Sequence, residues 1–530
     1  MADYIYTMEV RLTPDQQKAA NLVQEIARAA GMNLYLTGGT IRDIISGFPI
    51  RDLDFTVQGS PLKLQKDLER AGAVVAGIDE EVKTLFLQFA GGVRTEITMA
   101  RTERYEKTGK PPVITPATMI EDLRRRDFTI NAMALSLNPG SRGLLMDPFN
   151  GVADLEAKLI RVLHNYAFLD DPSRLIRATR FAARFHWPLE ERTQARYDSA
   201  KENNYIEYIR DRAVGYEIEQ LAYEDDPLHI VRTLEKEGWL KVLSPHWTTA
   251  KIDTNGLSQL MKTRQQMNDL GYQPDPAPAV MYFLTSRLSD REIADIRKLI
   301  PRDTLIEAWK DLEDNAKELA RRLTGKEAAT PSRTWQVLSE ARPEMILFLA
   351  VTARQQAVLQ KIKNFFAKWR QVQQKLPLPE MIELHITPQL PQYPKIANDV
   401  FLMLLDGKLR SRTETLKFLK PLAPPPPAPP PPPPAKRGRA AKAAAAAAGA
   451  APVAAPGAAS GGGRKKGKSA PPALPPPPVP LAAATSGAKA KIVAARPAAS
   501  KPSVPKSANP KSAPKPLQPA PNKSYSKKKH

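Results

Sequence analysis

The stretch GGTIRDIISGFPIRDLDFTV, from Gly38 to Val57, carries the pattern that decides the fold. Two glycines lead into about two turns of predicted helix, and a strand with Asp52 and Asp54 follows. Side chains two residues apart in a strand point to the same side, so the two carboxylates share a face while Leu53 and Phe55 face a core. Two like charges this close repel unless a cation lies between them, which indicates a divalent metal site.

The glycine turn ahead of the carboxylates has the chemistry of a phosphate site. Gly38 and Gly39 allow backbone N–H groups to come close to a ligand, and the start of the next helix favours an anion. Arg42 can reach a phosphate as a planar fork. Because Mg²⁺ prefers carboxylates together with phosphate oxygens, this is the layout expected for phosphoryl or nucleotidyl transfer.

Each half of this pattern also has an ordinary explanation. A lone Asp-x-Asp is common on solvated strands, and a lone Gly-Gly turn carries little information. The Gly-x-Gly-x-x-Gly fingerprint of dinucleotide-binding proteins is absent. The joint pattern, in a strand–turn–helix–strand context, is far more specific than either half.

The rest of the chain predicts an α+β protein with a helical C-terminal part. Alternating apolar residues predict further strands between residues 74 and 100, which complete a small mixed sheet with helices over residues 1–138. From there the apolar spacing is helical, which predicts a neck at 139–245 and a body at 246–420.

Residues 421–530 form a tail of different composition. They contain 19 of the 78 Lys and Arg residues, 28 of the 51 prolines and no Asp or Glu, so most of the formal charge of +22 comes from this segment. With few large apolar residues it cannot bury a core, and we expect it to be disordered. Its basic clusters suit RNA or the ribosome, and a solubilising tail is an equal alternative.

Composition also limits the compartment. The chain has no cysteine, which excludes disulfides and thiolate metal sites and fits a reducing environment. Its N-terminus lacks the apolar segment of a signal peptide, and no apolar run is long enough to span a bilayer. We therefore expect a soluble cytoplasmic protein without a membrane partner.

A second candidate site lies on the predicted helix at Ser173–Phe185. Arg174, Arg177 and Arg180 recur every three residues along one side of the helix, and Asp171 lies near its start, where a carboxylate is favoured. A carboxylate acceptor beside an arginine donor can pair with the polar edge of a base. The alternative is an amphipathic helix with a solvated basic side.

Glu96 is a candidate third carboxylate. In the predicted strand RTEITMA it lies on the polar side, opposite to Thr95 and Ile97. The alternatives are a solvated strand face or an ion pair with Arg94 or Arg101.

Four stretches resemble the class II tRNA nucleotidyltransferase and poly(A) polymerase family, within the polymerase-β-like nucleotidyltransferases. The first is the quoted stretch with its preceding strand. The others are EDLRRRDFTINAMAL (Glu121–Leu135), DPFNGVADLEAKLIRVL (Asp147–Leu163) and LDDPSRLIRATRFAARF (Leu169–Phe185). They occur in the family's order over residues 33–185, and a weaker resemblance continues to about residue 245.

The resemblance implies a role for each matched residue. Asp52 and Asp54 would be catalytic and would hold Mg²⁺ as a two-metal site, with Glu96 as a possible third ligand. Asp171 and Arg174 would read the base edge as a protein template for C or A. The residues that would bind the nucleotide are Gly38, Gly39, Arg42, Asp43, Arg126, Asp127, Asn131, Asp171, Arg174, Arg177 and Arg180. The alternative is that the three arginines before Asp127 face solvent. A cap by Asp127 on the backbone N–H groups of the following helix is compatible with nucleotide contact.

Two features bear on which base is added. The base-selecting motif usually begins Glu-Asp in the family, whereas here it begins with Asp170 and Asp171. The Gly-, Pro- and Thr-rich segment from Arg101 to Thr118 predicts a mobile loop. In the family a flexible loop at this place accompanies the addition of A.

The activity that the resemblance implies is template-independent addition of CCA, or part of it, to tRNA 3′ ends from CTP and ATP, with release of pyrophosphate. A poly(A) polymerase or an A-adding enzyme of the same fold is the nearest alternative. A non-catalytic RNA-binding protein with an inert site is the third.

Overall fold

The computed structural model describes residues 3–425. The chain divides into two units, Met1–Pro430 and Pro431–His530. Apart from residues 421–425, the segment predicted to be a disordered tail lies outside the described residues.

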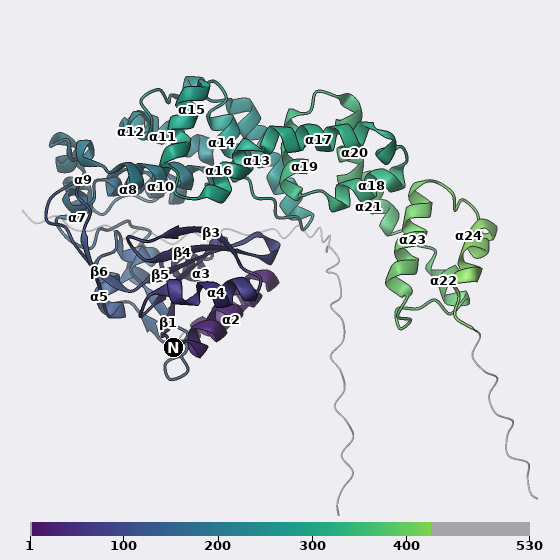
Figure 1. Cartoon of the computed structure of the whole chain (residues 1–530), viewed down its shortest axis with the longest axis horizontal. Coiled ribbons are helices and arrows are strands. Elements are labelled where there is room, and N and C mark those ends of the chain that lie inside the picture. The colour runs from purple at the N-terminus through teal and green to yellow at the C-terminus, as the bar shows by residue number, and fades with distance from the viewer. Residues whose placement is uncertain (1–2, 426–530) are drawn as a thin grey trace, which may run out of the picture. The chain divides into compact units, whose positions relative to one another are not determined.

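A seven-stranded mixed sheet forms the N-terminal part of the protein, as predicted (Figure 1). Its strand order is β3-β4-β5-β2-β1-β8-β9, and every neighbouring pair is antiparallel except β2 and β5. The strands are β1 (Leu34–Thr37), β2 (Asp52–Val57), β3 (Val74–Asp79), β4 (Thr84–Phe89), β5 (Val93–Met99), β8 (Ala134–Ser136) and β9 (Leu145–Met146).

Helices cover one face of this sheet and leave the other to the functional side chains. Helices α2 (Pro14–Ala29) and α4 (Gln65–Arg70) pack against strands of the sheet (Figure 1). Helix α2 begins with a capping box, in which Thr13 Oγ1 accepts from the Gln16 N–H at 3.2 Å and Gln16 Oε1 accepts from the Thr13 N–H at 3.0 Å. The remaining helices here are α1 (Tyr4–Arg11), α3 (Gly38–Ser46) and α5 (Met119–Arg124).

The segment predicted to be a mobile loop is instead a β-hairpin. Strands β6 (Arg101–Arg104) and β7 (Val113–Pro116) pair antiparallel in a separate two-stranded sheet. Its β-branched residues favour strands, and the Thr102 and Thr115 hydroxyls meet across the pair at 2.5 Å. Gly109, Pro111 and Pro112 lie at the tip between the two strands, and Pro116 ends β7.

The chain after β9 is helical, as predicted. The helices are α6 (Gly151–Ala157), α7 (Ala167–Asp170), α8 (Ser173–Phe185), α9 (Glu191–Glu202), α10 (Asp211–Ala222), α11 (Pro227–Glu237), α12 (Trp239–Leu243), α13 (Thr254–Asp269), α14 (Ala277–Leu284), α15 (Asp290–Leu299), α16 (Asp303–Lys310), α17 (Leu312–Thr324), α18 (Pro331–Glu340), α19 (Pro343–Thr352), α20 (Gln356–Phe366), α21 (Lys368–Gln373), α22 (Leu378–Glu383), α23 (Tyr393–Leu405) and α24 (Arg412–Leu419).

One hydrophobic core joins the sheet to most of these helices. It extends from Met8 to Trp369, and a smaller core around Val400 holds α22–α24 together. Among residues 3–425, no helix combines the length and the apolar character needed to cross a bilayer.

Candidate active site

Three carboxylates lie side by side at the centre of the sheet. The parallel pairing of β2 and β5 places Asp54 opposite Glu96 and Asp52 opposite Arg94. Leu53 is fully buried on the other side of β2, as the alternation predicted. The two aspartates therefore share a face, and Glu96 lies on that same face.

The glycine turn lies against these carboxylates. Gly38 has a φ of +61°, and a Cβ there would lie 3.2 Å from both Asp54 Oδ2 and Arg126 Nη1. Thr40 joins the turn to β2, because its Oγ1 accepts from the Asp54 N–H at 2.7 Å. A side chain at Gly38 or Gly39 would crowd Asp54, so the turn and the carboxylate pair form one unit.

The crowding of the acids changes their protonation. Burial raises the pKa of Asp54 to about 7, and the charges of Glu96 and Asp52 add to this, while Arg42 and Arg126 act in the opposite direction. Burial also raises the pKa of Glu96. A bound cation would stabilise the ionised forms of these acids.

Arg42 is fixed by a chain of polar contacts between segments that are distant in the sequence. Its Nε and Nη2 donate to Asp43 at 2.8 and 3.0 Å, and its Nη1 donates to Asn131 Oδ1 at 2.8 Å. Asn131 Nδ2 donates to Asp127 Oδ1 at 3.0 Å, and Arg177 Nη1 donates to Asp127 Oδ2 at 3.0 Å. Burial raises the pKa of Asp127, but Arg177 and Asn131 hold it below its usual value.

The three arginines before Asp127 do not all face solvent. Arg124 is exposed, whereas Arg125 and Arg126 both bond to the buried Asp122. Arg126 also donates to Thr56 Oγ1 at 3.1 Å, which holds it beside the glycine turn. Asp127 accepts from the adjacent Phe128 N–H at 2.7 Å but from no backbone N–H of the helical turn Thr129–Asn131, which it meets through the Asn131 side chain, so a backbone cap by Asp127 is wrong.

Asp171 and Arg174 lie at the start of α8. Asp171 Oδ1 accepts from the Ser173 N–H at 3.1 Å and from the Ser173 hydroxyl at 2.7 Å. Arg174 is buried and donates to the carbonyls of Arg125 and Ala167 at 2.9 and 3.3 Å. Both side chains are therefore held in one orientation.

The arginine row of α8 is paired with carboxylates, and although Arg180 is buried, the Arg177 side chain is 31% exposed. Arg177 Nε and Arg180 Nε donate to the two oxygens of Glu217 at 2.9 and 3.1 Å, and Arg180 Nη1 donates to Glu224 Oε1 at 2.7 Å. Arg184 pairs with Glu224 as well. The amphipathic helix with a solvated basic side is thus wrong, and Arg180 is committed to two glutamates.

The sequence reading missed these glutamates. Glu217 lies on α10, and Glu224 lies two residues beyond the end of that helix at Ala222. No spacing in the sequence pointed to this pairing.

Other charged residues that the sequence did not single out surround the carboxylates. Arg94 pairs with Asp52 and stacks on the Tyr223 ring, 3.3 Å from its centroid. Arg302, between α15 and α16, is the basic residue beside Glu96, with Nη2 at 4.0 Å from Glu96 Oε2. The predicted alternative of an ion pair between Glu96 and Arg94 or Arg101 is therefore wrong.

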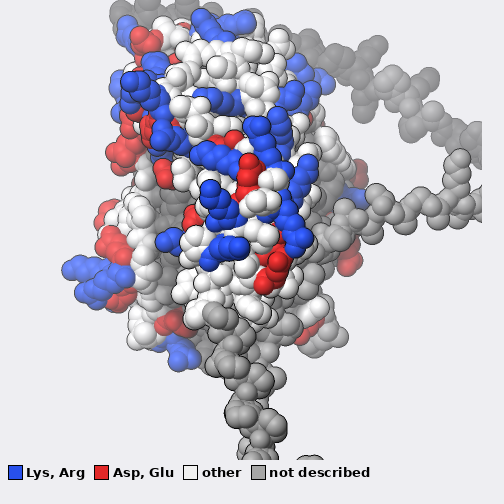
Figure 2. Space-filling model, turned by 90° about the vertical axis from the view of Figure 1, so that its right-hand side faces the viewer, with Lys and Arg blue, Asp and Glu red and all other residues white. Residues whose placement is uncertain are grey.

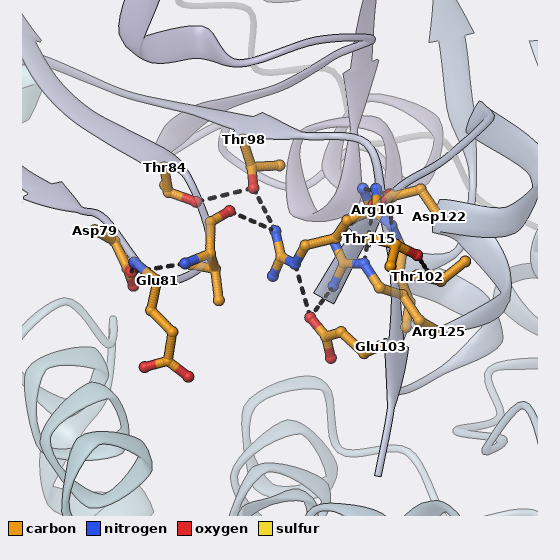
Figure 3. A network of polar contacts seen from close by, with 12 residues as sticks. Asp79, Glu81, Thr84, Thr98, Arg101, Thr102, Glu103, Thr115, Asp122 and Arg125 are labelled. Carbon is orange, nitrogen blue, oxygen red and sulfur yellow. Dashed lines mark hydrogen bonds and ion pairs between the residues drawn. The ribbon is translucent and has the colours of Figure 1, made fainter. Parts of the chain in front are cut away.

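A buried ionic network joins the β6–β7 hairpin to Arg125 and Asp122 (Figure 3). Glu103 Oε1 accepts from Arg101 Nε at 2.8 Å and from Arg125 Nη1 at 3.1 Å. Arg125 and Arg126 then share Asp122. Burial raises the pKa of Glu103, but Arg125 and Arg101 lower it to about 2 overall. The hairpin base is thus held rigidly beside the site.

All of the predicted site residues line one cavity of about 390 Å³. These residues are Gly38, Gly39, Arg42, Asp43, Asp52, Asp54, Glu96, Arg126, Asp127, Asn131, Asp171, Arg174, Arg177 and Arg180. The structure therefore brings the glycine turn, the carboxylates and the Asp171–Arg174 pair together, although the site residues come from four separate parts of the sequence.

The donor set fits a hard divalent cation. Mg²⁺ in nucleotide enzymes uses one or two carboxylates together with substrate phosphates, and Asp52 and Asp54 supply two. Over residues 3–425, no three His, Asp or Glu side chains converge closely enough to hold a metal ion by themselves. The role of Glu96 as a third metal ligand stays a prediction.

Comparison with known proteins agrees with this geometry. Residues 34–161 match the poly A polymerase head domain. The chain is similar to members of the tRNA nucleotidyltransferase and poly(A) polymerase family. These similarities indicate a nucleotidyltransferase, and enzymes of that family generally depend on a metal ion.

The similar proteins carry names that differ in which bases are added. The chain is 29% identical to the A-adding tRNA nucleotidyltransferase of Halalkalibacterium halodurans, over 72% of this chain and 87% of that protein. It is 34% identical to the multifunctional CCA protein of Alcanivorax borkumensis, over 40% of this chain and 51% of that protein. A solved CCA-adding enzyme in its apo form II shares 26% identity, covering 79% of this chain and 98% of the other, with a TM-score of 0.41.

Proposed function

We propose that this protein adds C and A nucleotides to tRNA 3′ ends from CTP and ATP, without a nucleic-acid template, with Mg²⁺ as its metal and in the cytoplasm. The observation that carries the proposal is the single cavity in which the glycine turn, the Asp52–Asp54 pair and the Asp171–Arg174 pair meet. These are the parts that nucleotidyl transfer requires: a phosphate cradle, a metal site and a means of choosing the base.

The reaction forms one bond and breaks one. The oxygen of the RNA 3′-hydroxyl bonds to the α-phosphorus of CTP or ATP, the bond from that phosphorus to the bridging oxygen breaks, and pyrophosphate leaves. The hydroxyl proton passes to water. When bound, Mg²⁺ supplies positive charge that favours ionisation of the hydroxyl and the departure of pyrophosphate.

The chain's own residues bind and orient the nucleotide. The N–H groups of Gly38 and Gly39, with Arg42 and Arg126, bind the triphosphate. Asn131 holds Arg42 in place at 2.8 Å, so the guanidinium does not have to be ordered when the nucleotide binds.

Asp171 and Arg174 read the Watson–Crick edge of the incoming base. Arg174 is anchored by two backbone carbonyls and Asp171 by Ser173, so acceptor and donor keep a constant spacing. A pair with fixed spacing can select C or A by complementary hydrogen bonds, as a template base would.

The helical part binds the body of the tRNA through its phosphates. Figure 2, viewed from the side on which α22–α24 lie in Figure 1, shows Lys and Arg side chains gathered on this face. Exposed basic residues around α23 and α24 are Lys395, Lys408, Arg410, Arg412, Lys417 and Lys420. Such a surface binds an RNA backbone without reading its sequence.

A second candidate function is the addition of A alone. The Halalkalibacterium halodurans relative, which is matched over most of its length, is named an A-adding enzyme. The two functions differ in the use of CTP and in the RNA end that is accepted.

One experiment separates these functions. Purified protein with Mg²⁺ is incubated with tRNA transcripts that end before CCA, after C or after CC, and with labelled CTP or ATP. Stepwise growth that stops after CCA supports the leading proposal, and a single A added only to the CC end supports the A-adding enzyme. Long A ladders without C would indicate a poly(A) polymerase. No incorporation would contradict the enzymatic proposal and favour an RNA-binding protein.

A further inference from the structure

A second cavity, of about 210 Å³, adjoins the carboxylates. It shares Asp52, Asp54, Glu96 and Arg302 with the first cavity, and its other walls come from β3, β4, β5 and the helical part of the chain. None of the four groups assigned to the triphosphate, Gly38, Gly39, Arg42 and Arg126, lines it. The two cavities therefore meet at the metal-binding face and have different chemistry on either side.

Unpartnered cationic donors lie in the wall of this second cavity. Arg94 Nη1 and Arg302 Nε are buried and have no hydrogen-bond partner among the described residues. Arg302 is only 9% exposed, and its guanidinium lies over the Phe86 ring at 4.7 Å. Its Nη1 is 2.8 Å from Glu219 Oε1, an ion pair without hydrogen-bond geometry. Burial of such donors costs free energy of folding unless a ligand accepts hydrogen bonds from them.

Acidic groups in the same wall argue against a purely anionic ligand. Asp275 Oδ1 accepts from the Ala277 N–H at 3.0 Å, whereas Glu344 Oε2 is buried without a partner. Pyrophosphate carries no hydroxyl for Glu344. A ribonucleotide carries a phosphate for the arginines and ribose hydroxyls for the glutamate.

We propose that the second cavity binds the 3′-terminal nucleotide of the acceptor RNA. Arg302 and Arg94 donate to its last phosphodiester, and Glu344 accepts from a ribose hydroxyl. In an in-line transfer the attacking oxygen and the leaving pyrophosphate lie on opposite sides of the α-phosphorus. The first cavity takes the triphosphate, so the attacking strand enters through the second. This assignment rests on the proposed function and names the residues that hold its RNA substrate.

The test pairs a change in the protein with a change in the RNA. Arg302→Met and the wild-type protein are assayed on normal RNA and on RNA with a neutral methylphosphonate as the last phosphodiester. For the wild type, the neutral linkage should lower kcat/KM for RNA by roughly 10- to 100-fold, since it removes a charge-assisted contact. Arg302→Met should show a similar loss on normal RNA and little further loss on modified RNA, with the KM for ATP unchanged. Arg321→Met, on the exposed face of α17, is the control for loss of one charge.

A second pair keeps the assignment testable if Arg302→Met does not fold. Removal of the 2′-hydroxyl from the terminal ribose of the RNA should slow the wild-type reaction by roughly 3- to 30-fold. The same change in the RNA should leave the rate of Glu344→Ala unaltered. If both variants respond to the modified RNAs as the wild type does, the assignment is overturned and the proposed function stands. Weaker inhibition of Arg302→Met by added pyrophosphate, with an unchanged response to RNA, would assign the cavity to pyrophosphate and also overturn it. A wild-type protein that incorporates no nucleotide would instead overturn the proposed function.

Discussion

Asp54 faces Glu96 directly across the parallel pairing of β2 and β5. Neither acid has a lysine or arginine bound to it by a short ion pair in the described part of the chain, and burial raises the pKa of both. The charges of Glu96 and Asp52 add to the shift at Asp54, and those of Asp52 and Glu219 add to the shift at Glu96. Without a bound cation, the ionised carboxylates on the central face of the sheet therefore repel one another.

Without metal, the folded protein should hold a proton on Asp54 that the unfolded chain has already lost. Its pKa is about 7 in the folded state and near 3.8 in the unfolded state, so its contribution to stability is fully present below about pH 4 and is lost as the pH rises to about 7. Asp54→Asn removes this titration. In a chelator, the Tm of Asp54→Asn minus that of the wild type should therefore increase from pH 4 to pH 7. A constant difference would contradict the raised pKa.

Loss of both aspartates should abolish catalysis without unfolding the protein. Asp52→Asn with Asp54→Asn removes the metal ligands, and we expect incorporation to fall by at least about 10³-fold because several kcal/mol of charge stabilisation disappear. Mg²⁺ should raise the Tm of the wild type and not that of the variant. Full incorporation by the variant would show that these residues do not hold the catalytic metal.

Asn131→Ala should impair nucleotide binding through Arg42. The amide joins Arg42 to Asp127 by bonds of 2.8 and 3.0 Å. Its loss should raise the KM for ATP by about tenfold and lower the free energy of unfolding by about 1–3 kcal/mol, since buried partners are left unpaired. Asn203→Ala, on an exposed segment, is the control. An unchanged KM for ATP together with reduced stability would mean that Asn131 has only a structural role.

Glu217→Ala should destabilise the protein more than it impairs chemistry. The residue is fully buried and pairs with Arg177 and Arg180. Removing one partner of a buried ionic network typically costs about 3–5 kcal/mol. Urea unfolding measures this loss, with the exposed Glu207→Ala as the control. A change below 1 kcal/mol would mean that the arginines find other partners.

Gly109→Ala should shift the tip of the β6–β7 hairpin. A Cβ at Gly109 would lie 2.5 Å from the Tyr208 carbonyl oxygen, and its φ is +73°. Gly92→Ala is a matched control, because its φ is +74° but the space around its Cβ is open. We expect Gly109→Ala to reduce A addition more than C addition, measured on RNAs ending in CC and before CCA. Equal effects of the two variants would assign the change to backbone strain alone.

Much of the fold followed from local pattern. The alternation around Leu53 and the helical spacing after residue 139 are properties of short segments, so they could be recognised without a structure. The hairpin was missed because glycine and proline at its tip outweighed the β-branched residues of its short strands.

The residues of the site and the chemistry that they suggest could be named from spacing along the chain: two acids on one strand face, glycines before a helix, and arginines at every third position. The electrostatic partners of these residues could not be named from spacing along the chain. Glu217 and Glu224 bind the α8 arginines from 37 to 44 residues away, and Arg302 lies beside Glu96 from a segment more than 200 residues further along the chain. These contacts depend on how helices pack against the sheet, and burial there sets the charge states of Asp54 and Glu96. Short-range spacing describes one element at a time, so neither the pairings nor the pKa shifts are encoded in it.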